Sequence, residues 1–195
     1  MIELAILGLL KDRPMHGYQL SREVAEQLGG MWRVSYGSLY PTLRRLQREG
    51  AIEGEMRDSA GARRKTVYRI TPQGERLFLD LLEEAPQEGQ VEDTRFRLRL
   101  AFFRYLPPET RIRLLERRRQ GLEGRLAEVK ARLRDPDQLD DYQRALLEHG
   151  SAAFGADIAW LTEMIHRERT RHGITAPVGD RRHASATLRR KEHSA

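Results

Sequence analysis

The sequence predicts a mainly α-helical protein with one small β-hairpin, and three observations lead to this prediction. Apolar residues recur every three or four positions through most of the chain, which is the period of an amphipathic helix. Between residues 51 and 70 that period changes to the alternation typical of strands. Two long helical stretches then follow, at residues 109–134 and 138–169, and they predict an antiparallel helical hairpin.

Composition and charge narrow the class of protein. Hydrophobic residues make up 39% of the 195 residues, which is enough to fill a core. The net charge of +6 favours an anionic partner, such as nucleic acid or an anionic membrane surface. No run approaches the roughly 18 apolar residues that span a bilayer, and acidic Glu3 lies where a signal peptide would be basic, so we expect a cytoplasmic protein. The absence of cysteine excludes disulfides and thiolate metal sites.

Three short helices are expected first, at residues 2–10, 16–28 and 35–50. The third begins with Ser35 as its N-cap, and its core-facing residues recur at helical spacing: Leu39, Leu43 and Leu46. Its remaining positions are polar, short or cationic: Ser35, Ser38, Thr42, Arg45 and Arg48. An ordinary amphipathic surface helix would have the same leucines, so the neighbouring elements must decide the interpretation.

Two strands are expected next, at residues 51–57 and 65–70, with residues 58–61 as the turn. Val67 and Arg69 alternate with Tyr68 and Ile70, a pattern that fits a half-buried edge strand.

Helices are expected over most of the remaining chain. The fourth helix starts with Thr71 as its N-cap and Pro72 at its first helical position. Proline, glycine and glutamine mark a candidate boundary after that helix. The expected division is an N-terminal domain at residues 1–85, a linker at 86–91, a helical domain at 92–169 and a disordered basic tail at 170–195.

The two long helices have apolar residues at near-heptad spacing. These candidate dimerisation residues are Leu115, Leu122, Leu126, Val129, Leu133, Phe154, Ile158, Leu161 and Ile165. They fit the core of an intramolecular hairpin, and equally a seam that also pairs with a second subunit. The sequence leaves both interpretations open.

Three helices, two strands and a fourth helix, in that order, are typical of the winged helix-turn-helix fold, whose third helix enters the DNA major groove. Short polar side chains allow this helix to approach the groove, and Arg45 can reach a phosphate or a guanine edge. Cations at the hairpin, namely Arg63, Arg64 and Lys65, suit phosphate contacts along the adjacent minor groove. A hairpin tip that merely improves solubility is the alternative interpretation.

Three segments closely resemble the PadR family of bacterial transcription regulators: HGYQL from His16, YGSLYPTLRRLQREGAIE from Tyr36 and RRKTVYRITPQGERL from Arg63. The similarity covers residues 1–85, and residues 92–169 resemble the helical C-terminal domain of the virulence-activator subgroup. The resemblance implies a homodimer that binds an inverted-repeat operator in double-stranded DNA. It also implies repression that a small-molecule effector or another signal releases.

The resemblance further implies DNA-binding roles for ten residues: His16, Tyr18, Ser35, Tyr36, Ser38, Tyr40, Thr42, Arg63, Arg64 and Lys65. For Tyr40 packing in the core is an equal alternative. For His16 and Tyr18 the alternative is local packing and helix capping.

Catalytic and metal-binding patterns are missing from the sequence. The aspartates between residues 135 and 141 lack the glycine and the final carboxylate of a calcium loop. The histidines at 149, 166 and 172 lack the spacing of a zinc site. We therefore expect neither an enzyme nor a cofactor.

The alternative function is a helical protein–protein adaptor in which the winged helix is only structural. It predicts that replacing Arg63, Arg64 and Lys65 leaves function intact. Several aromatic residues could line an effector pocket, although core packing is their commoner role: Phe96, Phe102, Phe103, Tyr105, Phe154 and Trp160.

Overall fold

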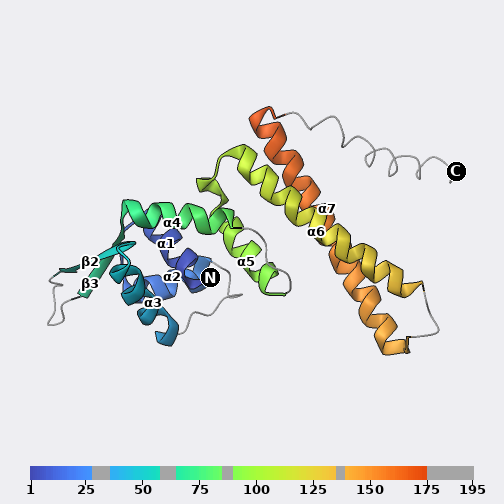
Figure 1. The fold of residues 1–195 in the computed structure, drawn as a ribbon, viewed down its shortest axis with the longest axis horizontal. Helices are drawn as coiled ribbons and strands as arrows, with labels where there is room; N and C mark the ends of the chain where they lie inside the picture. The colour runs from blue at the N-terminus through green and yellow to red at the C-terminus, as the bar shows by residue number, and fades with distance from the viewer. Residues whose placement is uncertain (28–35, 58–64, 85–89, 135–138, 175–195) are drawn as a thin grey trace. The chain divides into compact units, whose positions relative to one another are not determined.

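The computed structural model describes residues 1–27, 36–57, 65–84, 90–134 and 139–174. The elements in chain order are α1 (Ile2–Asp12), β1 (Met15–His16), α2 (Gly17–Gln27), α3 (Tyr36–Arg48), β2 (Ile52–Arg57), β3 (Lys65–Ile70), α4 (Pro72–Glu83), α5 (Gln90–Ala101), the 3-10 helix η1 (Phe103–Tyr105), α6 (Pro108–Leu133) and α7 (Asp141–His172) (Figure 1). The fold is mainly helical with one small sheet, which confirms the predicted class. Two compact units divide the chain after Leu106.

Helix α1 forms the centre of the N-terminal unit. Its residues from Leu4 to Leu10 are all buried, and it contacts α2, α3, α4 and β3. The leucines of α3 at positions 39, 43 and 46 are completely buried, as the spacing predicts. Burying one such side chain stabilises a fold by about 1.5–3 kcal/mol, so these contacts fix which face of α3 turns outward.

The sheet has three antiparallel strands in the order β1-β3-β2. The prediction of an edge position for β3 is wrong, because Met15 and His16 of β1 pair with Tyr68 and Val67 on its second side. Strand β1 has only two residues, which is too short to show an alternating pattern in the sequence. Strands β2 and β3 together are called the wing below.

Helix α4 begins as predicted. The Thr71 hydroxyl accepts a hydrogen bond from the Gly74 amide at 3.1 Å and donates one to the Gly50 carbonyl at 2.6 Å. A Cβ atom at position 74 would overlap the Ala51 carbonyl oxygen, so only glycine fits there. This junction joins the residues that follow α3 to the start of α4.

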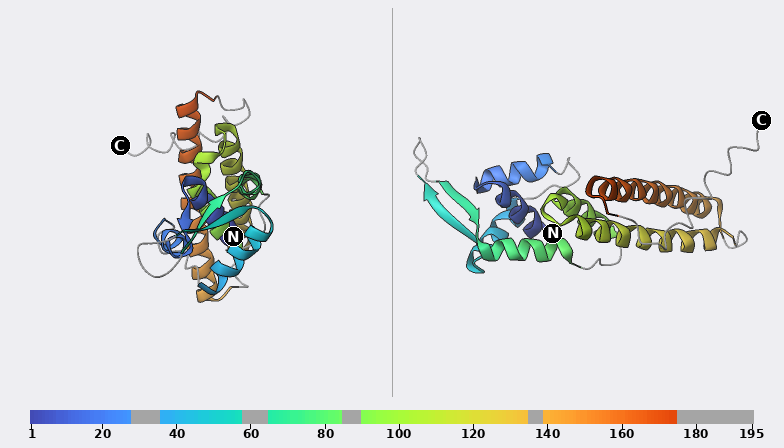
Figure 2. Two further views of the ribbon diagram at one scale, coloured as in Figure 1. Left: turned by 90° about the vertical axis from the view of Figure 1, so that its left-hand side faces the viewer. Right: turned by 90° about the horizontal axis from the view of Figure 1, so that it is seen from above.

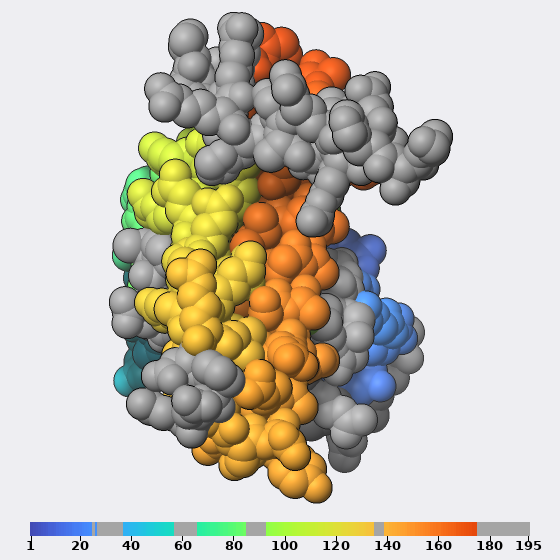
Figure 3. All heavy atoms as spheres, turned by 90° about the vertical axis from the view of Figure 1, so that its right-hand side faces the viewer, coloured from blue at the N-terminus to red at the C-terminus, as the bar shows by residue number. Residues whose placement is uncertain are grey.

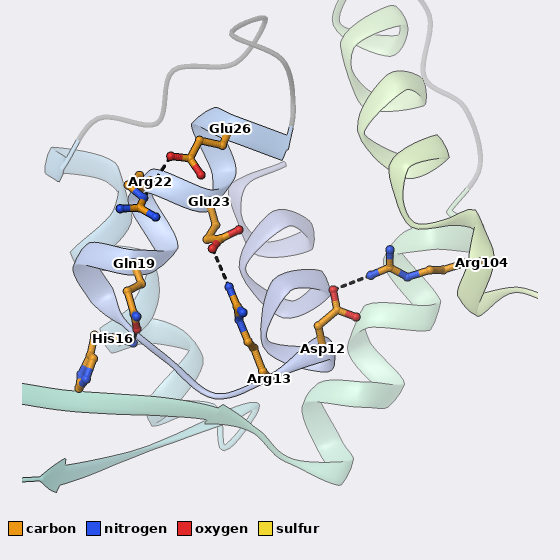
Figure 4. A network of polar contacts seen from close by, with 8 residues as sticks. All are labelled: Asp12, Arg13, His16, Gln19, Arg22, Glu23, Glu26 and Arg104. Atoms are coloured by element: carbon orange, nitrogen blue, oxygen red, sulfur yellow. Dashed lines mark hydrogen bonds and ion pairs between the residues drawn. The ribbon is translucent and has the colours of Figure 1, made fainter.

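Helix α5 and η1 pack within the N-terminal unit. The Phe102 ring lies against Gly8 of α1, where a Cβ atom would come within 2.6 Å of its Cζ. The buried Arg99 donates to the Leu81 carbonyl at 3.2 Å, and Arg104 of η1 donates to Asp12 at 2.5 Å (Figure 4). The boundary between the two compact units therefore lies further along the chain than the linker expected at residues 86–91. Residues 86–89 of that linker lie outside the described residues.

Helices α6 and α7 run side by side in the second unit and form the predicted antiparallel hairpin (Figures 2 and 3). Arg111 of α6 pairs with Glu168 of α7 at 3.1 Å, and Glu116 pairs with Arg169. Helix α7 starts at an Asp140 capping box and ends at Gly173, which has φ 65°.

The helix thus continues to His172, past the expected start of the tail at residue 170, and residues 175–195 lie outside the described residues. Within the described ranges, no helix is both long and apolar enough to cross a membrane.

Candidate nucleic-acid interface

The outer face of α3 is small and cationic. Gly37, Pro41, Arg44 and Arg48 are exposed on the side opposite the buried leucines. Pro41, Arg44, Gln47 and Arg48 line a surface hollow of about 630 Å³. Two guanidinium groups therefore point outward from a helix whose other face is fixed in the core.

Arg45 lies on the flank of α3 that meets α1. Its guanidinium pairs with Glu3 of α1 and with Glu49 at 3.2 Å. These contacts indicate that Arg45 helps to hold α3 against α1. Arg44 is exposed, and the sequence did not single it out as a site residue. The DNA-binding role expected for Arg45 from the sequence is untested, and its two ion pairs favour a structural role instead.

The polar residues of α3 differ in their surroundings. Ser38 is exposed, and half-buried Thr42 donates its hydroxyl proton to the Ser38 carbonyl at 2.8 Å. The Tyr40 ring lies over the start of α2, where a Cβ atom on Gly17 would come within 3.1 Å of its Cε1. Tyr40 is still partly exposed, so it has both a packing contact and an open surface. Ser35 and the side chain of Tyr36 lie outside the described residues.

Tyr68 of β3 lies close to the same face of α3. Burial raises the pKa of Tyr68, and the nearby Tyr40 raises it further, whereas Arg44 lowers it. These influences place the outer face of α3 next to the wing.

His16 and Tyr18 lie at the start of α2 (Figure 4 shows His16 beside Gln19). The His16 amide donates to the Gln19 side chain at 3.0 Å, and His16 Nδ1 lies 3.2 Å from the Thr66 carbonyl oxygen. His16 thus has the local contacts expected of a packing residue, whereas Tyr18 is mostly exposed.

The basic end of the wing is only partly described. Lys65 of β3 lies opposite Arg57 of β2 in the strand register. Arg63 and Arg64 lie outside the described residues. Glu53 and Arg69 form a cross-strand pair at 3.7 Å. Phosphate contacts by the wing stay a prediction.

The aromatic candidates for an effector pocket are divided between the two units. Phe102 and Tyr105 pack edge-to-face on Phe78 of α4, with ring centroids 5.7 and 5.4 Å apart, and Phe96 packs in the same way on Phe103 at 6.3 Å. These contacts are core packing. Phe154 and Trp160 lie on α7.

The described residues contain no cluster of metal-ligating side chains. No group of three histidine, aspartate or glutamate side chains there could hold a metal ion.

The candidate dimerisation residues fall into two groups. Four are buried within the chain itself: Leu115, Leu122, Leu161 and Ile165. The other five are half-buried: Leu126, Val129, Leu133, Phe154 and Ile158. Their pairing with a second subunit stays a prediction.

Comparison with known families gives two matches. Residues 6–80 match the family described as "Transcriptional regulator PadR-like family", and residues 94–169 match "Virulence activator alpha C-term".

The chain is 38% identical over 90 residues to the transcriptional regulator Rv3488 of Mycobacterium tuberculosis, which covers 45% of this chain and 80% of that protein. It is 27% identical over 131 residues to the negative transcriptional regulator PadR of Bacillus subtilis, covering 67% of this chain and 71% of that protein. The crystal structure of B. subtilis PadR with operator DNA aligns with a TM-score of 0.43 and 20% identity, over 85% of this chain and 96% of that one.

Proposed function

Because the chain belongs to the PadR-like family of transcriptional regulators, which are DNA-binding proteins and not enzymes, we propose that it is a homodimeric repressor. In this proposal the dimer binds an inverted-repeat operator and is released by a small-molecule effector or another signal. The observation that carries the proposal is the outer face of α3, where Arg44 and Arg48 project opposite buried leucines.

The shape and charge of this face suit the major groove. A groove about 12 Å wide admits one helix, and guanidinium groups bind both phosphates and the O6 and N7 atoms of guanine. Gly37, Ser38 and Pro41 are small and exposed, so the helix backbone can come close to the base edges. Arg44 and Arg48 are then the residues that reach phosphate or guanine.

The outer face of α7 supports the homodimer. Three large apolar side chains are exposed there: Tyr142 at 89%, Leu146 at 70% and Trp160 at 47%. Their spacing of four and fourteen residues puts them on one side of the helix. In an antiparallel pair of α7 helices that cross midway between residues 142 and 160, Tyr142 would face the partner's Trp160, and Leu146 would face the partner's Ala156. The first pair would bring two exposed aromatic rings together, and the second would set a large side chain against a small one, which favours a second copy as the partner of this face.

Repression and its release are the further parts of this proposal. The B. subtilis relative is named a negative regulator, which favours repression. An effector that changes the separation of the two α3 helices would lower affinity for a two-fold operator.

The experiment is a binding titration and footprint on the DNA upstream of the protein's own gene. We expect affinity for one symmetric site at least about 1,000-fold above that for random duplex, with half-sites about 34 Å apart. Arg44→Gln and Arg48→Gln should weaken binding, and Arg76→Gln, at an exposed position of α4, serves as the control. Equal affinity for the site and for random DNA at physiological salt would refute the proposal. Unchanged activity in a reporter assay after replacement of Arg63, Arg64 and Lys65 would favour the adaptor alternative.

A further inference from the structure

Met56 of β2 is a large apolar side chain exposed near the end of the wing. It is 69% exposed, although exposing a methionine gives no advantage to folding. Its position relative to α3 indicates what it does.

The strand register divides the wing into two faces. The pairs Ile52–Ile70, Gly54–Tyr68 and Met56–Thr66 share one face, since directly paired residues point to the same side of a sheet. Along this face the β2 residues change from buried Ile52 through half-buried Gly54 to exposed Met56.

Helix α3 packs on that same face. A Cβ atom on Gly54 would lie 3.3 Å from Gln47 Nε2 and 3.0 Å from Cγ2 of Thr66, the pairing partner of Met56. Gln47 itself lines the hollow with Arg44 and Arg48. The outer face of α3 therefore continues through Gln47 and Gly54 toward Met56.

The opposite face of the wing carries its charged residues. On that face the strand register pairs exposed Glu53 with Arg69, which form an ion pair at 3.7 Å, and it pairs Arg57 with Lys65. The face with Met56 has no charged residue among its three pairs. The wing therefore has one uncharged face, and that face is the one on which α3 packs.

We infer that Met56 makes a nonpolar contact with DNA next to the groove that α3 enters, against a deoxyribose or a thymine methyl group. The inference rests on the proposed function. A thioether side chain is flexible and polarisable, so it can adapt to such a surface. The contact adds affinity without neutralising a phosphate.

The test uses the full-length protein and its operator, with Met56→Gln as the variant. We expect an operator Kd about tenfold higher, with an unchanged slope of log K against log salt, because a nonpolar contact releases no counterion. Met56→Leu should bind within about twofold of the unchanged protein, since it keeps the apolar contact. Leu79→Gln, at an exposed apolar position of α4, is the matched control and should leave Kd unchanged.

An operator with deoxyuridine in place of thymidine separates the two nonpolar partners. If Met56 contacts a thymine methyl, this operator should bind the unchanged protein about tenfold more weakly, and Met56→Gln should no longer change the Kd. If Met56 contacts a deoxyribose, the missing methyl should leave the Kd unchanged. Selective operator binding with the same Kd for Met56→Gln would overturn the inference alone. Loss of selectivity in the unchanged protein would instead overturn the proposed function and, with it, this inference.

Discussion

Arg44 and Arg45 are adjacent in α3, and the structure predicts that replacing each by glutamine affects a different property. Arg44→Gln should weaken DNA binding, and Arg45→Gln should lower stability. Arg44 is exposed on the outer face, so Arg44→Gln removes a cation from the face proposed to bind DNA and leaves the core intact. Each phosphate contact contributes about 0.9 to the slope of log K against log salt. A dimer loses two such contacts, so the slope should fall by about 2, and the rise in Kd should be largest at low salt.

Arg45→Gln should instead lower stability. It removes the pairs with Glu3 and Glu49, in which more than a third of the arginine side chain is exposed, so solvent screening limits the loss to about 0.5–1 kcal/mol. Operator affinity and its salt slope should stay within experimental error.

Two measurements on both variants check these expectations. Fluorescence anisotropy with the operator duplex at four or more salt concentrations gives Kd and slope, and urea unfolding gives the free energy of unfolding. A smaller salt slope for Arg45→Gln together with an unchanged one for Arg44→Gln would refute our assignment of the two flanks of α3.

Three further predictions concern the junction and the dimer. Gly74→Ala forces a methyl group onto the Ala51 carbonyl, so it should lower the free energy of unfolding by about 3 kcal/mol in thermal or urea unfolding. Gly121→Ala, with open space around it, is the control and should be neutral or stabilising. Equal effects of the two substitutions would contradict the close approach at position 74. Thr71→Ala should lower the free energy of unfolding by about 1–2 kcal/mol because the N-cap hydrogen bond is lost, and Thr71→Ser should keep most of that stability. If serine is no better than alanine, the cap is not the cause. Trp160→Glu should shift the protein toward monomer in sedimentation velocity, and an unshifted dimer would exclude the outer face of α7 as its interface.

Local sequence signals predict the elements of this fold well. The three leucines of α3 are buried as their spacing requires, and Thr71 with Pro72 starts α4 at the predicted position. Both features depend on residues within one or two turns of helix, so a local pattern contains them.

Contacts between distant segments are the part that the sequence does not reveal. The central position of β3 depends on its pairing with Met15 and His16, some fifty residues earlier. Arg44 and Arg45 lie on opposite flanks of the leucine stripe at similar angles, and only the presence of Glu3 on one flank decides which arginine is exposed. The grouping of α5 with the N-terminal unit likewise depends on a distant contact, the hydrogen bond from Arg99 to the Leu81 carbonyl of α4.

The separation of the two faces of α3 has an evolutionary consequence. Residues that hold the helix in the core and residues that face outward share no positions, so under the proposed function a change at 37, 41, 44 or 48 should alter recognition at little cost to folding. Duplicated copies of such a gene could diverge to new operators by a few substitutions, while the same leucines keep the helix in place.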